Sequence, residues 1–481
     1  MTLRIPKATF DALAGYIRSS ESVLISHELE WYMDEKPRVL GVLAMDVIDG
    51  DFLGTVLGRD ARGRFRGVTM TPFCETPDAA RALLKDELDR CSKLPDAEFW
   101  QGDEEGKPLD FFSPVVATAR LSPSFVRIAT GEGFSPARAL IESMMPYYED
   151  VDGNFVEQFQ STGFDSRFWE LYVFALMTEG GFAFDRSFHA PDFFCRSVLG
   201  DVFVEAMTAN PTVNAAGLVI EPEVPREKSR FKEYYQEYMP IKWGSTLTSK
   251  LQKEYWRLPH VADKPIVFAI QDFHVPRAMT FLNHSLMPYL YGISFTALYD
   301  ANERLVVKAT ARGPHKWGFK TIETGFFRLP GSENISAVIS NPTATISKFN
   351  RMGHLAGLGS RDVTMVCVGT RHHHDDNSAL PIPFKMLVND PRYSETWVEG
   401  VDVFHNPDAK FPLDDLFLIG ASHHFLENGN MRSLIPRFHP YQSETFIISP
   451  ERISGVMGRR QSRLAAGQSE ESRYHPFLGR R

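Results

Sequence analysis

The sequence SRFWELYVFALMTEGGF (166–182), followed closely by SFHAPDFFCRSVLGDVFVEAMTAN (187–210), decides the fold of this chain. Its first part is apolar on nearly every side, which predicts a mostly buried helix from about Ser166 to Glu179. The Gly-Gly pair that follows is typical of a helix end. The runs FAFDRS, PDFFCRSV and VFVEAMTA then predict three consecutive strands, the last two joined around Gly200.

Three acids interrupt this apolar sequence. Glu170 lies in the expected helix, Asp192 directly follows Pro191, and Glu205 lies inside VFVEAM. Carboxylates in apolar surroundings cost free energy unless something compensates them. A divalent metal ion is the usual compensation when all the available ligands are oxygens. The stretch therefore predicts a metal site.

The expected hairpin brings two of these acids together. If residue 194 lies opposite residue 205, and residue 192 opposite residue 207, then Asp192 and Glu205 are diagonal neighbours on one face of the sheet. A slip of one residue would place them on opposite faces. The prediction of a shared site therefore depends on the pairing register.

Length and composition limit the class of protein. The 481 residues suffice for two or three domains, and contents of 43% hydrophobic and 23% charged residues are ordinary for a soluble globular protein. No apolar run reaches the roughly 18 residues of a membrane span. The N-terminus lacks an apolar signal core, so we expect a cytoplasmic protein without membrane contact. The four cysteines form no CxxC pair, which argues against a zinc ribbon and a disulfide framework.

Working outward from the quoted stretch, the pattern predicts an α/β chain of several domains. A helix from about Ser245 to Leu258 and a buried strand at 265–273 complete the order helix, three strands, helix, strand. The expected divisions are an N-terminal α+β domain (1–100), a helical connector (101–160), the central core (161–285), a C-terminal mainly β domain (286–453) and a flexible tail (454–481).

Two C-terminal segments are expected to be turns or loops. The glycine-rich KFNRMGHLAGLG (348–359) predicts a turn or loop. The run RHHHDD (371–376) resembles a metal site in composition, but consecutive side chains do not converge easily on one ion, which favours a surface loop. A metal-dependent hydrolase of another type stays open as an alternative, provided that His405 shares a cleft wall with His372, His373 or His374.

The central acids resemble a known motif. Pro191-Asp192, twelve intervening residues and Glu205-Ala206-Met207 resemble the PD-(D/E)XK motif of the restriction-endonuclease-like nuclease superfamily. The element order over about 165–275 is similar to the αβββαβ core of that superfamily. The whole chain is also similar to bacterial proteins that share its FWELY, PDFF and VEA segments.

The resemblance implies a role for each matching residue. Asp192, Glu205 and the backbone carbonyl of Ala206 would be metal ligands, and Glu170 would be the acid on the first core helix. Met207 stands where the motif has its lysine. Some members of the superfamily place that lysine on the next helix, where Lys250 is the candidate. The implied cofactor is Mg²⁺, with Mn²⁺ as a substitute.

These observations predict a metal-dependent nuclease that acts on nucleic acid, with DNA as the expected substrate. Mg²⁺ held by carboxylates can activate water and stabilise the phosphate during phosphodiester hydrolysis. The net charge of −9 argues against a protein that coats nucleic acid, but it allows a local basic groove. The basic side chains that could face phosphates are Arg226, Lys228, Arg230, Lys232, Lys242, Arg312, Lys316 and Lys320.

A different class of function is compatible with the same sequence. Because the motif lysine is missing, the chain could be a catalytically inactive nuclease fold. Such a protein would serve as a scaffold or nucleic-acid-binding protein in a bacterial defence or DNA-processing assembly. The N- and C-terminal domains would then contact protein partners.

Overall fold

Helices and strands alternate along the chain, which confirms the expected mixed α/β class. The computed structural model describes residues 2–104, 110–150 and 152–448. Their strands form five sheets. The flexible tail expected at 454–481 lies outside the described residues. Within the described ranges, no helix is both long and apolar enough to cross a membrane.

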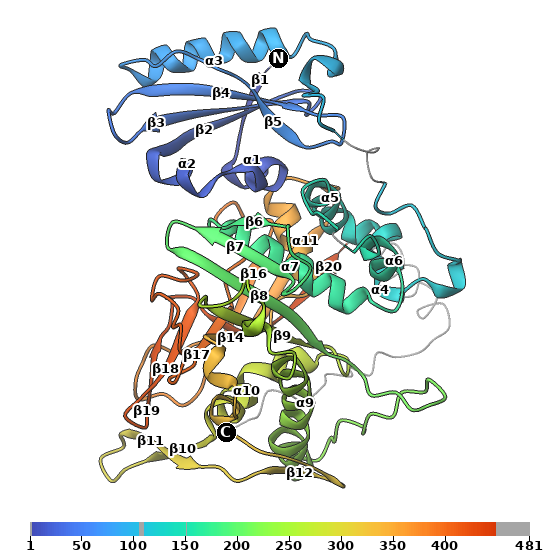
Figure 1. Cartoon of the computed structure of the whole chain (residues 1–481), viewed down its shortest axis with the longest axis vertical. Coiled ribbons are helices and arrows are strands. Elements are labelled where there is room, and N and C mark those ends of the chain that lie inside the picture. Colours follow the sequence, from blue (N-terminus) through green and yellow to red (C-terminus); the bar gives the residue numbers. More distant parts are fainter. Residues whose placement is uncertain (1, 105–109, 151, 449–481) are drawn as a thin grey trace, which may run out of the picture.

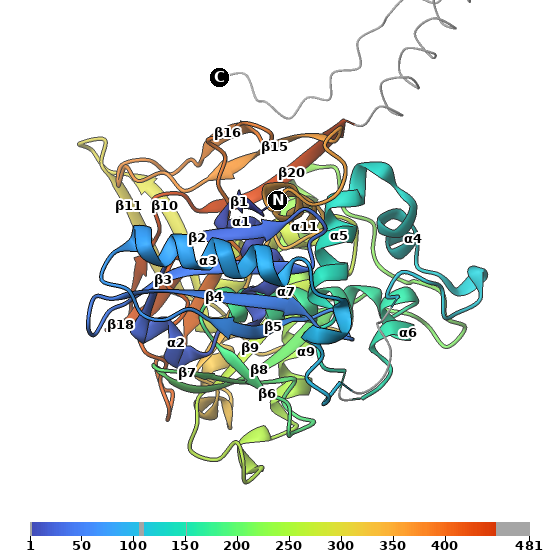
Figure 2. The ribbon, with the colours of Figure 1, turned by 90° about the horizontal axis from the view of Figure 1, so that it is seen from above.

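The N-terminal part is an antiparallel sheet with a helix on each face, drawn in blue at the top of Figure 1. Its strands, in spatial order, are β1 (Thr2–Ile5), β2 (Ser26–Asp34), β3 (Val39–Asp46), β4 (Phe52–Arg59) and β5 (Phe65–Met70). The helix α3 (Pro77–Cys91) lies across one face (Figure 2), and α1 (Lys7–Ala14) packs on the other. The short α2 (Ser20–Ile25) leads into β2.

Thr76 caps α3, because its Oγ1 accepts a hydrogen bond from the Ala79 amide at 3.4 Å. The helix lies very close to β4. A Cβ atom on Gly54 would come within 2.7 Å of the Leu84 side chain, so a larger residue there would push α3 off the sheet.

Three helices follow in the connector, namely α4 (Pro123–Thr130), α5 (Ser135–Met144) and α6 (Phe155–Gln160). Helix α5 packs against α11 (Ile346–Leu355). Helix α11 includes the first part of the segment 348–359, which was expected to be a turn or loop. That expectation was wrong for most of the segment. Gly353 permits close helix packing there, because a Cβ atom on it would lie 2.2 Å from the Pro136 carbonyl oxygen.

The largest sheet crosses the middle of the molecule (Figure 1). Its strands, in spatial order, are β19 (Asn430–Leu434), β18 (Ser422–Glu427), β17 (Asp402–His405), β14 (Ala337–Ser340), β9 (Ile266–Asp272), β8 (Gly200–Ala209), β7 (Phe193–Ser197) and β6 (Ala183–Asp185). Strands β8, β9 and β14 run parallel, while β6, β7 and β8 form antiparallel pairs. Strands on the two sides of residue 285 therefore share one sheet.

Helices cover both faces of this sheet. On one face lies α7 (Phe164–Glu179), the expected buried helix, where the indole of Trp169 donates to the Ala269 carbonyl at 3.0 Å. On the other lie α9 (Met239–Leu251) and α10 (Leu282–Tyr291). The expected second helix ends at Leu251 rather than Leu258, and Glu254 has a left-handed backbone (φ 50°) before the 3-10 turn Tyr255–Arg257.

The register of the β7–β8 hairpin differs from the expected one by two residues. Phe194 pairs with Phe203, so residue 192 comes opposite Glu205 rather than Met207. Because side chains alternate with a period of two, this shift keeps Asp192 and Glu205 on the same face. It makes them direct rather than diagonal neighbours.

The remaining strands form three smaller sheets. One contains β16 (Ile382–Leu387), β15 (Thr364–Arg371) and β20 (Pro440–Ile448). The other two are hairpins, β10 (Ile293–Tyr299) with β11 (Leu305–Ala311), and β12 (His315–Trp317) with β13 (Lys320–Ile322). A short helix, α8 (Lys228–Glu233), leads through the π-helical turn Tyr234–Tyr238 into α9.

Candidate carboxylate site

Glu205 is the centre of a buried polar cluster on β8. Only 2% of the surface of this residue is exposed to solvent. The carboxylate oxygen Oε1 accepts hydrogen bonds from the Lys250 ammonium and, at 2.9 Å, from the Tyr255 hydroxyl. The other oxygen accepts a hydrogen bond from the Asp192 amide at 3.2 Å. The acid on the central strand is therefore tied to both its neighbouring strand and helix α9.

Asp192 lies just before β7, where that strand begins to pair with β8. Its Oδ2 accepts a hydrogen bond from the Ala206 amide at 2.8 Å. Within the described parts of the chain, its Oδ1 accepts no hydrogen bond. Asp192 as a residue is partly buried.

Glu170 projects from α7 and is bound by two groups. The Arg167 guanidinium donates to both carboxylate oxygens, at 2.9 and 2.7 Å, and the Tyr148 hydroxyl donates at 3.2 Å. Arg167 lies three residues before Glu170 on the same helix, and an ion pair at this spacing is what we would expect if Glu170 had only a structural role. Glu170 nevertheless lies close enough to Glu205 and Asp192 for their charges to act on it.

The three carboxylates disfavour one another's charge. Burial, followed by the charges of Glu205 and Glu170, raises the pKa of the Asp192 carboxyl well above its ordinary value. Burial also raises the pKa of Glu170, against the opposing effect of Arg167. A bound cation would reverse this, since it favours the ionised form of each acid.

Lys250 is oriented into the cluster, as the sequence hypothesis required. It lies on the last turn of α9, and its side chain is about one-third exposed. Burial alone would lower the pKa of the Lys250 ammonium, but the charge of Glu205 and the hydrogen bond to it raise that pKa. The group is therefore a proton-bearing cation at neutral pH. Met207, which stands at the motif lysine's position, is buried in the core under α9.

Sequence reasoning missed two residues that bound this site. Tyr255 falls within the helix expected from Ser245 to Leu258, where it counted as one of the apolar residues, whereas it follows the end of α9. Arg186 lies in the loop between β6 and β7, over the rings of Tyr148 and Phe193 at 4.9 and 4.8 Å. Its Nη1 donates to the Asp192 carbonyl at 3.1 Å. An arginine in a loop has no sequence signal that distinguishes it from a solvated one.

The donor set fits Mg²⁺ by its chemistry. The side-chain groups are all oxygens, their like charges are incompletely compensated, and Asp192 Oδ1 has no partner among the described residues. In that same part of the chain, no three His, Cys, Asp or Glu side chains are arranged to hold a metal ion. Mg²⁺ needs only one or two protein carboxylates, because water and phosphate oxygens complete its shell. Asp192 and Glu205 would hold it.

Among the described residues, the C-terminal histidines belong to no group of three or more His, Cys, Asp or Glu side chains that could hold a metal ion. His405 Nε2 lies 2.9 Å from His423 Nδ1. Asp402 Oδ1 lies 2.7 Å from His424 Nε2. Because side chains alternate along a strand, His405 and Asp402 occupy opposite faces of β17. His372 contacts Tyr441 at 2.6 Å instead of His405, and residues 372–376 form a loop.

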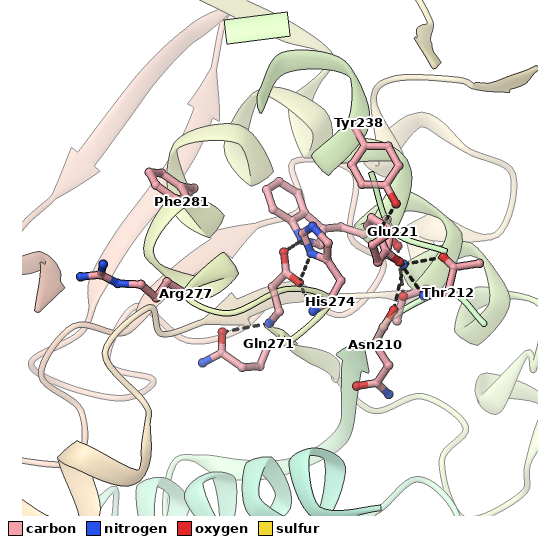
Figure 3. A network of polar contacts seen from close by, with 12 residues as sticks. Asn210, Thr212, Glu221, Tyr238, Gln271, His274, Arg277 and Phe281 are labelled. Atoms are coloured by element: carbon pink, nitrogen blue, oxygen red, sulfur yellow. Dashed lines mark hydrogen bonds and ion pairs between the residues drawn. The ribbon is translucent and has the colours of Figure 1, made fainter. Parts of the chain in front are cut away.

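A second polar network lies beyond the carboxyl ends of β8 and β9. Figure 3 shows Tyr238 directed toward Glu221, which accepts hydrogen bonds from the Tyr238 hydroxyl and from the backbone amide of Thr212. The Lys242 ammonium donates to Glu221 at 2.6 Å, so this lysine serves an internal ion pair. Nearby, His274 is buried and hydrogen-bonded on both sides, to Asp272 at 2.6 Å and to Tyr234 at 2.8 Å. Lys242 also donates to the Asn210 carbonyl at 2.8 Å, so the network holds the loop after β8 against α9.

The other basic residues that were expected to face phosphates divide into two groups. Arg230 pairs with Glu227 at 3.6 Å, and Arg312 pairs with Glu237 at 2.6 Å. Those without an ion pair in the described residues are Arg226, Lys228, Lys232, Lys316 and Lys320.

No known protein-family model matches this chain, and neither a curated protein nor a solved structure matches it.

Proposed function

We propose that the chain is a Mg²⁺-dependent nuclease of the restriction-endonuclease-like superfamily, with DNA as its substrate. The observation that supports this most is the contact between Lys250 and Glu205. A lysine 45 residues away in the sequence reaches the acid of the motif that lacks its own lysine. The order of α7, β6, β7, β8, α9 and β9, with β6, β7, β8 and β9 adjacent in one sheet, also supports the proposal.

Each residue has a distinct task in this proposal. Asp192 and Glu205 hold the metal ion, which when bound would activate a water molecule and stabilise charge on the phosphate. Lys250 bears a positive charge where a scissile phosphate would approach, so it would stabilise negative charge that develops on the phosphate oxygens. Tyr255 restrains Glu205 by its hydrogen bond, and Ala206 restrains Asp192.

Glu170 has a smaller task than the sequence suggested. Arg167 already neutralises it, so we assign it to positioning and to the local charge balance rather than to direct metal binding. Helix α7, which is buried from Phe168 to Met177, fixes the position of Glu170.

The proposal is tested by incubating purified full-length protein with supercoiled plasmid and with single-stranded DNA. We expect nicking or linearisation with Mg²⁺ or Mn²⁺ and none with EDTA. Absence of cleavage by folded protein under every metal condition would favour the inactive scaffold instead. Cleavage that persists in EDTA would contradict a metal-dependent mechanism.

A further inference from the structure

Two neighbouring hairpins stand apart from the main sheets. They span residues 293–322 and consist of β10–β11 and β12–β13, which we call the basic arm. Among the described strands, each hairpin pairs only with itself. Figure 1 shows them at the end of the molecule opposite the N-terminal domain. Most residues of β10 and β11 are exposed on both faces of the ribbon.

The arm has a charge that the rest of the chain does not share. The arm contains five lysine or arginine residues and two acids, Asp300 and Glu303, in a chain whose net charge is −9. Of the five, Arg312 is paired with Glu237. The other four, which have no ion-pair partner in the described residues, are Arg304, Lys308, Lys316 and Lys320. An excess of cations over acids, with most of the cations outside ion pairs, is the electrostatic footprint of a polyanion-binding surface.

An aromatic side chain lies among these cations. Phe319, in the turn between β12 and β13, is completely exposed, with Lys316 and Lys320 in the two strands that flank it. Such exposure of a large apolar side chain has no benefit for folding. An exposed ring between cations suits nucleic acid, where it can contact bases while the lysines contact phosphates.

The arm is attached to the helix that bears Lys250. Ile322 of β13 packs against the α9 backbone at Gly244, where a Cβ atom would come within 2.5 Å of it. Lys250 comes six positions after Gly244, so the two are about 9 Å apart along the helix axis. Both the arm and Lys250 are on the α9 side of the large sheet. A long polyanion bound at the carboxylate site could therefore contact the arm at the same time.

We propose that the basic arm grips duplex DNA, with the β10–β11 ribbon in the major groove. This rests on the proposed nuclease function and names its substrate class. The B-DNA major groove admits a two-stranded ribbon, whereas the major groove of A-form RNA is too narrow and deep. One face of the ribbon is polar at its centre, because Lys308 lies opposite Thr296. That face can reach phosphates and base edges.

The test measures DNA binding separately from cleavage. Fluorescence anisotropy with a labelled 30-bp duplex is recorded over a range of salt concentrations, in an Asp192→Ala background that removes a proposed metal ligand. The triple variant Lys308→Ala/Lys316→Ala/Lys320→Ala should lower the slope of log K against log [salt] by about 2.7, or about 0.9 per lysine. The matched control is Lys36→Ala/Lys85→Ala/Lys93→Ala, three exposed lysines of the N-terminal domain. Phe319→Ala should weaken binding without changing the slope.

The outcomes separate the arm from the catalytic proposal. A smaller slope for the arm variant alone, together with tighter binding of duplex DNA than of duplex RNA, would support the inference. An unchanged slope, or an equal change in the N-terminal control, would overturn it even if wild-type protein cleaves DNA. Tighter binding of duplex RNA or single-stranded DNA, lost in the arm variant, would overturn the assignment to duplex DNA. Failure of the wild type to cleave DNA would leave the binding result intact.

Discussion

Replacement of Lys250 by methionine should lower the rate of DNA cleavage by roughly 10²- to 10³-fold, the usual loss when one positioned group that stabilises transition-state charge is removed. Methionine preserves most of the volume and the apolar stem of the side chain. It removes the charge that contacts Glu205. The measurement is single-turnover cleavage of a labelled duplex at saturating protein concentration.

The matched control for Lys250 is Lys253→Met, three residues further along the chain. Lys253 is exposed and has no ion pair among the described residues, so its replacement should leave the cleavage rate within about twofold. Stabilisation by Mg²⁺ should be retained in both variants, because neither residue is a proposed ligand. Equal rates for Lys250→Met and wild type would exclude Lys250 as the displaced motif lysine.

Replacement of Asp192 by asparagine should change stability in opposite directions with and without metal. Without metal at pH 8, we expect a higher melting temperature, because the variant lacks a buried negative charge beside Glu205 and Glu170. Asparagine still offers an oxygen to the Ala206 amide. In wild type, Mg²⁺ at about one hundred times its Kd should stabilise the fold by about 2.7 kcal/mol, and the variant should lose this response.

The ionisation of Asp192 should also make the stability of the metal-free protein depend on pH. The folded-state pKa of Asp192 is raised above the unfolded value of about 3.9, so the folded state holds the proton more tightly. Metal-free stability should therefore fall as pH rises from about 4 through the folded-state pKa, and this component should vanish in Asp192→Asn. Thermal melts with EDTA across this range measure it. A variant that is less stable than wild type at pH 8 and still responds to Mg²⁺ would contradict the assignment of Asp192.

The acidic site could be anticipated because its residues break local patterns. Asp192 and Glu205 are charged where strands prefer apolar side chains, and Lys250 borders the apolar stripe of its helix. The predicted register was wrong by two residues, yet an even error keeps both acids on one face. Periodicity therefore gave the face correctly, while the exact partner depended on the turn at Gly200.

Other features depend on contacts that no local pattern encodes. Strand β14 joins the central sheet by pairing with β9, and β17 pairs in turn with β14. Each pair joins strands that are more than 50 residues apart in the sequence, which local patterns do not encode, so the sequence suggested a separate C-terminal domain instead. The segment 348–359 resembled a turn because it contains three glycines, and the sequence does not show the backbone of Pro136 against which Gly353 packs in α11. Tyr255 reaches Glu205 only because the chain turns sharply after α9.

The most direct test of the carboxylate site compares plasmid cleavage by wild type, Asp192→Ala and Glu205→Ala, each with Mg²⁺ and with Mn²⁺. Circular dichroism and thermal melts establish that all three proteins are folded. We predict cleavage by wild type that is lost in both variants with either metal. Cleavage retained by both folded variants would show that the phosphodiester bond is broken elsewhere, and it would contradict the assignment of Asp192 and Glu205 as the catalytic site.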